Sequence, residues 1–257
     1  MSQFEDHFSQ QSVDYAVYRP RYPAGLFAYL ASLAPNRRLA WDCGTGNGQA
    51  AIDLAGHFEQ VVATDASADQ IAHAFAHERI EYRVGAAEQT DLEPNSVDLV
   101  TVAIAVHWFD LPRFYTTVRR VSVPNGILAV WTYYLPVIEP VVDAIVYQYY
   151  REVLAGFWPE RWQYVDERYQ TLPFPFPEMK TPAFEIQTEW NLDQLVGFLS
   201  SWSASQRFRE ARGQHPLSAI WPALTRSWGS PDQIRLIRWP LYLRVGLADQ
   251  SEANQNG

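Results

Sequence analysis

The amino-acid sequence predicts an α/β fold with a mostly parallel sheet and helices on both faces of that sheet. Between positions 38 and 131, short apolar segments typical of strands alternate with segments whose apolar residues recur at helical spacing. The continuous apolar run at 97–105 is typical of a strand buried on both faces. A glycine-rich segment, residues 42–48, separates the first expected strand from the first expected helix. Strands and helices that alternate in this way form βαβ units, whose strands run parallel.

Each expected element is assigned to a range of residues. The core strands are expected at 39–43, 61–64, 80–84, 97–105 and 127–131, and the helices between them at 49–58, 67–77 and 111–121. Two later strands are expected at 184–190 and 234–245, with helices near 192–211 and 216–228. Ser67 is expected to cap the second helix, because its hydroxyl can accept a hydrogen bond from an amide of the first turn.

Residues 132–182 interrupt this alternation. Their first part is apolar and aromatic, and the prolines at 173, 175 and 177 exclude regular helix or central strand from the segment that contains them. We interpret this range as an insertion that covers one end of the sheet.

The composition argues against several classes of protein. The 257 residues carry a formal net charge of -9, and an acidic surface repels the phosphates of nucleic acids. The single cysteine, Cys43, excludes an internal disulfide, and the longest apolar run is far shorter than a membrane span. The polar residues 1–14 lack the apolar region of a secretory signal. We therefore expect a cytoplasmic protein, a monomer or homodimer, with no nucleic-acid or membrane partner.

No metal site is expected. His73 and His77 are four residues apart on an expected helix, which is a spacing that can bind metal, but no third ligand is evident near them. We interpret both as surface residues.

The glycine-rich segment has the pattern D-x-G-x-G-x-G, from Asp42 to Gly48. Glycines let the backbone turn tightly and approach a ligand, and the helix that follows offers free amides. A dinucleotide-binding loop would have its third glycine at position 49, which is Gln49 here. A structural turn without a ligand is the other interpretation. At the end of the second strand, Asp65 is placed either to accept hydrogen bonds from ribose hydroxyls or to serve as a turn residue.

This pattern resembles the first motif of class I S-adenosylmethionine (SAM)-dependent methyltransferases. Residues 85–88 and 96–100 also resemble family motifs, and 107–109 and 123–126 resemble a small-molecule branch that includes trans-aconitate-type enzymes. Residues 15–23 resemble the lid of that branch. The resemblance implies a Rossmann-like, seven-stranded, mostly parallel sheet with an antiparallel final strand and a helical insertion or lid.

The resemblance also implies a domain layout. A single SAM-dependent methyltransferase domain is expected over 1–250, followed by a disordered tail at 249–257. Within it we expect an N-terminal lid (1–37), a cofactor-binding core (38–131), the insertion (132–182) and C-terminal strands and helices (183–248).

The same resemblance implies SAM as cofactor and S-adenosylhomocysteine (SAH) as product. Asp42 is expected to hold the ammonium of the methionine moiety, and the Ala87 backbone and Glu88 side chain to lie near the adenine. The expected cofactor-binding residues are Tyr18, Arg19, Asp42, Gly44, Thr45, Gly46, Gly48, Asp65, Ala66, Ala87, Glu88, Ala103 and Ile104. The acceptor is expected to contact Tyr22, Trp108 and Tyr133, although a single aromatic residue is more often part of a core.

Two positions depart from the family pattern. Ile104 stands where similar sequences commonly have glutamine, which removes a polar contact at the end of the fourth strand and is expected to affect activity or acceptor preference. Asn125 replaces a more usual glycine, and we expect no effect because asparagine tolerates a positive φ.

Methyl transfer to a small molecule is the expected reaction, with an oxygen, for example that of a carboxylate, as the acceptor atom. A carboxylate needs no base, whereas a hydroxyl or amine must lose a proton, and His107 is the best-placed candidate base. A structural histidine that orients the loop is the equally open alternative. Two other functions remain open on the sequence, namely an NAD(P)-dependent oxidoreductase and a SAM-binding protein without transferase activity.

Overall fold

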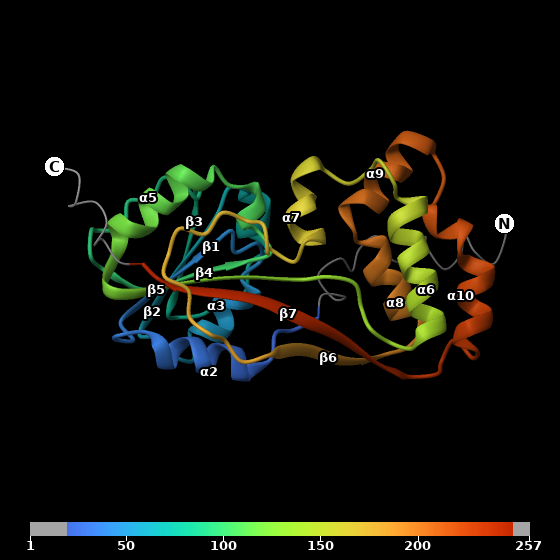
Figure 1. Ribbon diagram of the computed structural model, residues 1–257, viewed down its shortest axis with the longest axis horizontal. Helices are drawn as coiled ribbons and strands as arrows, with labels where there is room; N and C mark the ends of the chain where they lie inside the picture. The colour runs from blue at the N-terminus through green and yellow to red at the C-terminus, as the bar shows by residue number, and fades with distance from the viewer. Residues whose placement is uncertain (1–19, 249–257) are drawn as a thin grey trace. The chain divides into compact units, whose positions relative to one another are not determined.

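The computed structural model describes residues 20–248, and all structural statements below concern these residues. Tyr18, Arg19 and the tail at 249–257 lie outside them. Within this range the sheet has seven strands in the order β3-β2-β1-β4-β5-β7-β6 (Figure 1). The strands are β1 (Leu39–Cys43), β2 (Gln60–Asp65), β3 (Ile80–Val84), β4 (Val97–Ala103), β5 (Ser122–Tyr133), β6 (Phe184–Trp190) and β7 (Arg235–Leu247).

The direction of the strands confirms the predicted fold class. β1 pairs in parallel with both β2 and β4, and the pairs β2–β3 and β4–β5 are also parallel. β7 runs antiparallel to β5, from Ile127 paired with Leu247 to Tyr133 paired with Leu241. The sheet is therefore mostly parallel, with an antiparallel final strand.

The helices are α2 (Ala24–Leu33), α3 (Gln49–Leu54), α4 (Ala68–Ala72), α5 (Leu111–Val121), α6 (Pro140–Gln148), α7 (Gln163–Asp166), α8 (Leu192–Ser200), α9 (Ser203–Arg212) and α10 (Trp221–Trp228). Shorter turns are η2 (Val106–Trp108), η3 (Tyr149–Val153, a π-helical turn), η4 (Glu160–Trp162) and η5 (Pro216–Ala219). In the described part of the chain, none of these helices has the length and apolarity that crossing a membrane requires.

The chain divides into two compact units. The sheet unit comprises Tyr22–Tyr133, Tyr164–Phe184 and the described residues 240–248. The helical unit comprises Tyr134–Gln163 and Glu185–Trp239, together with the described residues Pro20 and Arg21. The layout of one domain with an insertion at 132–182 stays a prediction, and the two units divide that insertion between them.

The core of the sheet unit explains why its strands read as apolar runs. α2 and α3 cover one face of the sheet and α5 covers the other (Figure 1). β4 lies between two neighbours, and its residues from Val97 to Val102 are buried. α5 presents Phe114, Val118 and Val121 to this core at helical spacing.

Two helices of the sheet unit are shorter than the sequence predicts. α3 ends at Leu54, and the amides of Gly56 and His57 bond the carbonyls three residues earlier, which tightens the chain into turns. α4 ends at Ala72, because the Phe75 amide donates to Asn47 in the glycine loop instead of continuing the helix. Ser67 caps α4 as predicted, accepting from the Gln70 amide at 3.3 Å.

The helical unit has an aromatic core of its own. Trp190, Phe198 and Trp239 pack with ring centroids 5.2 to 5.6 Å apart. In η3 and α9, the Tyr149 hydroxyl and the Ser205 hydroxyl are hydrogen bonded at 2.7 Å, and both side chains are buried. Burial of these large rings gives the helical unit a hydrophobic core of its own.

Candidate cofactor and acceptor site

The order of the strands defines where a ligand site belongs. From β1 the chain moves to β2 and β3 on one side, and β4 and β5 lie on the other side. The carboxyl ends of these parallel strands share one edge, and ligands bind at that edge where the strand order reverses, which is between β1 and β4. The predicted cofactor residues that the structure describes lie at these carboxyl ends or in the loops that follow them.

All three glycines of the loop after β1 have positive φ, at 70° for Gly44, 57° for Gly46 and 88° for Gly48. A Cβ on Gly44 would lie 2.6 Å from the Ala105 Cβ, and a Cβ on Gly48 would lie 2.2 Å from the Tyr82 hydroxyl. Packing therefore requires glycine at both of these positions. A Cβ on Gly46 would meet nothing nearer than 3.7 Å among the described residues. Gly46 is thus the position where room is left beside the backbone.

Asp42 is a buried acid at the end of β1. Its two carboxylate oxygens accept hydrogen bonds from the hydroxyls of Thr45, at 2.5 Å, and Thr101, at 2.7 Å. Burial raises the pKa of Asp42 to about 6, against the opposing effect of these two hydroxyls. A cation placed beside this carboxylate would offset the cost of burying its charge. Thr101, which pairs with Asp42 between β4 and β1, was not among the predicted site residues.

Asp65 joins the loops that follow β1, β2 and β3. One carboxylate oxygen accepts from the Gly46 amide and the other from the Ser67 amide, both at 2.8 Å. The Asp65 carbonyl accepts from the Gly85 amide at 2.9 Å. Each carboxylate oxygen keeps a second lone pair, so these contacts leave capacity for ribose hydroxyls.

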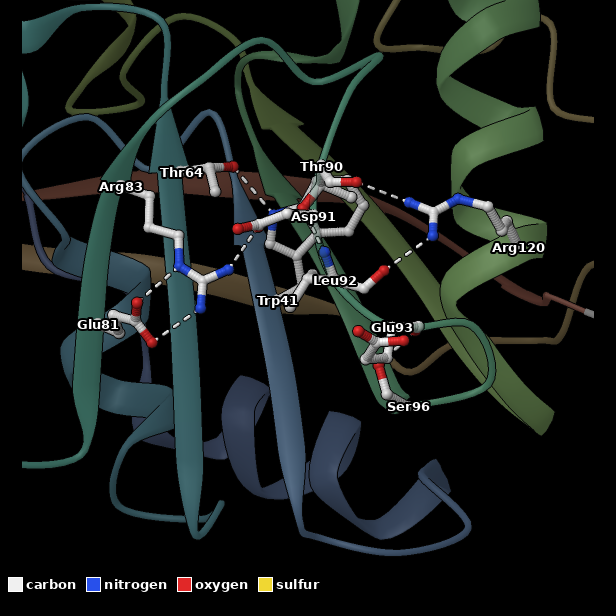
Figure 2. A network of polar contacts seen from close by, with 10 residues as sticks. All are labelled: Trp41, Thr64, Glu81, Arg83, Thr90, Asp91, Leu92, Glu93, Ser96 and Arg120. Carbon is white, nitrogen blue, oxygen red and sulfur yellow. Dashed lines mark hydrogen bonds and ion pairs between the residues drawn. The ribbon is translucent and has the colours of Figure 1, made fainter.

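The segment after β3 is held by α5 and by β3. Glu88, predicted to lie near adenine, accepts from the Asp110 amide at 2.7 Å, and its carbonyl accepts from the Thr117 hydroxyl. Figure 2 shows that Arg120 of α5 donates to the carbonyls of Thr90 and Leu92, each at 2.8 Å.

The same view shows a second anchor for this segment. Arg83 of β3 binds Asp91 at 2.6 Å and Glu81 at 2.7 Å (Figure 2). Residues 90–92, which follow the predicted adenine segment, are therefore bonded to both α5 and β3.

Ile104 has a strained backbone at the end of β4. Its φ is 55°, a value that a β-branched residue rarely adopts, and its amide donates to the Trp131 carbonyl at 2.9 Å. This conformation ends β4 at Ala103, two positions before the predicted end. Strain of this kind tends to gather at ligand sites. Asn125 also has a positive φ, 61°, which asparagine tolerates.

His107 is buried in η2, just beyond β4. Its Nδ1 lies 2.8 Å from the hydroxyl of Tyr169, a residue 62 positions later in the chain. Tyr169 is fully buried and forms a side-chain hydrogen bond with Thr132 of β5. Burial raises the pKa of the Tyr169 phenol well above its ordinary value, so the phenol stays protonated. Tyr169 was not among the predicted site residues.

The backbone around Tyr169 is strained and pinned. Arg168 and Tyr169 have φ values of 55° and 59°. The Tyr169 carbonyl accepts from Arg244 of β7 at 3.0 Å, and Arg244 also pairs with Glu178. The bond from Arg244 thus holds the strained turn in which the Tyr169 phenol lies beside His107.

The three predicted acceptor residues lie in the sheet unit but differ in exposure. Trp108 is 47% exposed and its ring centroid lies 4.9 Å from that of His107. Tyr22 is half-buried and packs edge-on against Trp131, with centroids 5.5 Å apart. Tyr133 ends β5 and is half-buried.

The chemistry of these groups suits SAM. The buried Asp42 carboxylate suits an ammonium, the space at Gly46 suits a close backbone approach, and Asp65 suits ribose hydroxyls. The glycine spacing lacks the third glycine that a pyrophosphate-binding loop uses, and that position is Gln49.

Known proteins support the same assignment. A family model described as a methyltransferase domain matches residues 41–130. A Dictyostelium discoideum protein, provisionally named a methyltransferase, is 32% identical over 249 residues, which are 94% of this chain and 95% of that protein. A Saccharomyces cerevisiae protein, provisionally named a SAM-dependent methyltransferase, is 25% identical to this chain. The match covers 75% of this chain and 79% of that protein.

A solved structure agrees in fold and in sequence. It comes from Anaeromyxobacter dehalogenans, is described provisionally as a type II methyltransferase, and superposes with a TM-score of 0.84 at 45% identity. The match covers 90% of this chain and 98% of that one. With relatives similar over nearly their whole length, a matching family model and the expected sheet, the chain belongs to the class I SAM-dependent methyltransferases.

Proposed function

We propose that this methyltransferase acts on an oxygen atom of a small organic acceptor, either a carboxylate or a hydroxyl group. The observation that carries the proposal is the position of His107, a buried imidazole that directly follows the carboxyl end of β4. A carboxylate reacts as the anion, and a hydroxyl gives its proton to a base such as this imidazole. The acidic chain, with a net charge of -9, favours a small molecule over a nucleic acid.

The cofactor would be held by the loops at the carboxyl edge of the sheet. Asp42 would hold its ammonium and Asp65 its ribose, with Gly46 allowing the backbone to approach. The other proposed cofactor-binding residues are Gly44, Thr45, Gly48, Ala66, Ala87, Glu88, Ala103 and Ile104. Tyr18 and Arg19, which lie outside the described residues, also belong to the proposed set. When bound, SAM supplies a methyl group on a positively charged sulfur, which is open to direct displacement.

The chain's own contribution is alignment and exclusion of water. The segment after β3 and the glycine loop are already hydrogen bonded in place, so little order has to be created on binding. We propose that Tyr22, Trp108 and Tyr133 line the acceptor site. A cytoplasmic location, a monomeric or homodimeric state and a place in the trans-aconitate-type branch stay predictions.

A labelled methyl donor tests the proposal. The enzyme is incubated with SAM carrying an isotopic methyl label and a panel of carboxylic acids, alcohols, phenols and amines. The label is expected on oxygen, and alkaline treatment then separates methyl esters, which release labelled methanol, from methyl ethers, which do not. Transfer to nitrogen alone, or to no member of the panel while SAM binds, would contradict the proposal.

A further inference from the structure

We propose that Thr101 is a positioning residue for cofactor binding, whose hydroxyl holds the Asp42 carboxylate in its charged form so that it pairs with the ammonium group of SAM. The proposal rests on the proposed function, which has that ammonium at Asp42, and deepens it by naming what keeps the carboxylate charged. Its basis is a fully buried hydroxyl in the middle of β4.

Thr101 is a polar residue in an apolar stretch. The other residues of 99–103 are all apolar, and Thr101 has no exposed surface. Threonine and valine have nearly the same volume, so valine would serve packing here as well. A buried hydroxyl costs free energy unless it has a partner. The partner of the Thr101 hydroxyl is Asp42, to whose Oδ1 it donates at 2.7 Å.

The register of the sheet brings these two side chains together. Asp42 of β1 pairs directly with Thr101 of β4 in the parallel ladder, so both side chains lie on the same face. Thr45 of the glycine loop donates to the other carboxylate oxygen, Oδ2, at 2.5 Å. Each oxygen thus accepts one hydroxyl hydrogen. The two bonds fix the orientation of the carboxylate and leave it acceptor capacity for an ammonium.

A hydrogen bond donated to a carboxylate favours its charged form, against burial, which raises the pKa of Asp42 to about 6. The charge of Asp65 in β2 also raises this pKa, and the Ala51 amide of α3 lowers it. Burial raises the pKa of Tyr82 in β3 to about 12 and that of Cys43 well above its ordinary value, so both of these neighbours stay neutral. The two threonine hydroxyls therefore do most to keep the carboxylate charged.

Loss of the Thr101 hydroxyl is expected to change how cofactor binding depends on pH. Without it the Asp42 carboxyl takes up a proton at a higher pH, and a neutral carboxyl attracts an ammonium much less. Thr101→Val should move the pH at which the affinity for SAH begins to fall by about one unit above the wild-type value of about 6. The Kd should then rise about fivefold at about pH 6 and less than about twofold at about pH 7.5.

Calorimetric titration of SAH between about pH 5 and about pH 7.5 tests this. The ammonium of the ligand titrates in the same way in every sample, so a difference between variants reports the protein. Thr101→Ser keeps the hydroxyl and should restore the wild-type profile. Thr101→Ala removes the hydroxyl without adding a methyl group and gives the same test if valine does not fit.

Thr64→Val is the matched control. Thr64 is also buried, in the neighbouring strand β2, and its hydroxyl accepts from Nε1 of Trp41 at 2.9 Å (Figure 2). The variant loses a buried hydrogen bond, which lowers stability. We expect it to keep the wild-type dependence of SAH affinity on pH.

A second readout follows Asp42 itself, in protein without cofactor. Aspartate is labelled with ¹³C at the carboxyl carbon, and the Asp42 signal is assigned by its absence from Asp42→Asn. The wild-type signal should titrate with a midpoint at about pH 6, and that of Thr101→Val about one unit higher. A threonine with a merely structural role would affect stability without moving this midpoint.

The outcomes separate this inference from the proposed acceptor. An unchanged Asp42 midpoint in Thr101→Val overturns the inference, and so does a moved midpoint with an unchanged SAH profile. An SAH affinity that is independent of pH in the wild type overturns the placement of the ammonium at Asp42 and this inference with it. A shifted profile together with methyl transfer to nitrogen alone overturns the proposed acceptor and leaves the role of Thr101 intact.

Discussion

At the scale of single residues, the charge of Asp42 lowers the stability of the folded protein, whereas binding of an ammonium group requires that charge. Folding buries its carboxylate with two hydroxyl partners, and its pKa rises from 3.8 to about 6. The pKa of Asp42 is higher in the folded than in the unfolded protein, so the protonated carboxyl favours folding. Its contribution to the free energy of unfolding is fully present below the unfolded pKa and is lost as the pH rises through about 6. At neutral and alkaline pH the buried charge therefore costs about 3 kcal/mol.

Replacement of this charge is expected to stabilise the protein without ligand. Asp42→Asn should raise the free energy of unfolding by about 1 to 3 kcal/mol at alkaline pH, with the gain shrinking toward acidic pH. Denaturant unfolding at several pH values measures this. Asp98→Asn is the matched control, because buried Asp98 accepts from the Arg38 and Leu39 amides, and it should instead lose about 1 to 3 kcal/mol. An Asp42→Asn protein that is less stable at every pH would contradict this explanation.

The same carboxylate predicts how binding depends on pH. An ammonium needs Asp42 ionised, so the affinity for SAH should fall as the pH drops through about 6, by about tenfold per unit below that value. Titration calorimetry between about pH 8 and about pH 5 measures this. The Asp42→Asn variant should bind weakly with no such dependence. A flat affinity in the wild type would place the ammonium away from Asp42.

At the scale of elements, α5 acts as a clamp on the segment that follows β3. Arg120 bonds two carbonyls of that segment, while its neighbour Arg119 instead donates to the Pro175 carbonyl. Arg120→Ala should therefore raise the Kd for SAH about three- to tenfold by loosening the predicted adenine segment, with kcat at saturating SAM little changed. Arg119→Ala should leave that Kd unchanged. Equal effects of the two variants in fluorescence or calorimetric titrations would exclude the clamp.

The glycine loop supplies a second comparison at this scale. Gly46→Ala meets no clash and should cost only the left-handed backbone penalty of about 1 to 2 kcal/mol, yet weaken SAH binding about tenfold or more. Gly48→Ala forces a Cβ onto Tyr82 and should lower stability by about 2 to 4 kcal/mol. Thermal unfolding with and without SAH separates the two effects. If Gly46→Ala bound SAH like the wild type, the ligand would not approach this part of the loop.

At the scale of the whole molecule, the sequence was informative wherever local chemistry decides the structure. β1, β3, α5 and β6 have the predicted limits, because apolar periodicity and turn residues set them. The placement of Asp42, the glycines and Asp65 at one sheet edge followed from parallel strands alone. The lengths of α3 and α4 did not follow, because tertiary bonds such as Phe75 to Asn47 ended them.

The features of the site that the sequence did not predict depend on contacts between positions far apart in the chain. His107 and Tyr169 are 62 residues apart, and no local pattern marks a phenol in an irregular segment as the partner of that imidazole. Thr101 becomes a partner of Asp42 only through the register of β4 against β1. The left-handed backbone of Ile104 could not be predicted either, because an isoleucine in an apolar run is expected to continue an extended strand. The division into two units cuts through a range that the sequence marked only as an insertion.

The most direct test of the whole account is a calorimetric titration of SAH into the wild-type protein and into Asp42→Asn, under the same conditions above the pKa of Asp42. The account predicts one binding site in the wild type and a loss of at least about tenfold in affinity in the variant, because an ammonium would then lack its buried carboxylate. Equal affinities in the two proteins, or no binding to the wild type, would contradict the claim that the carboxyl end of β1 holds the methyl donor.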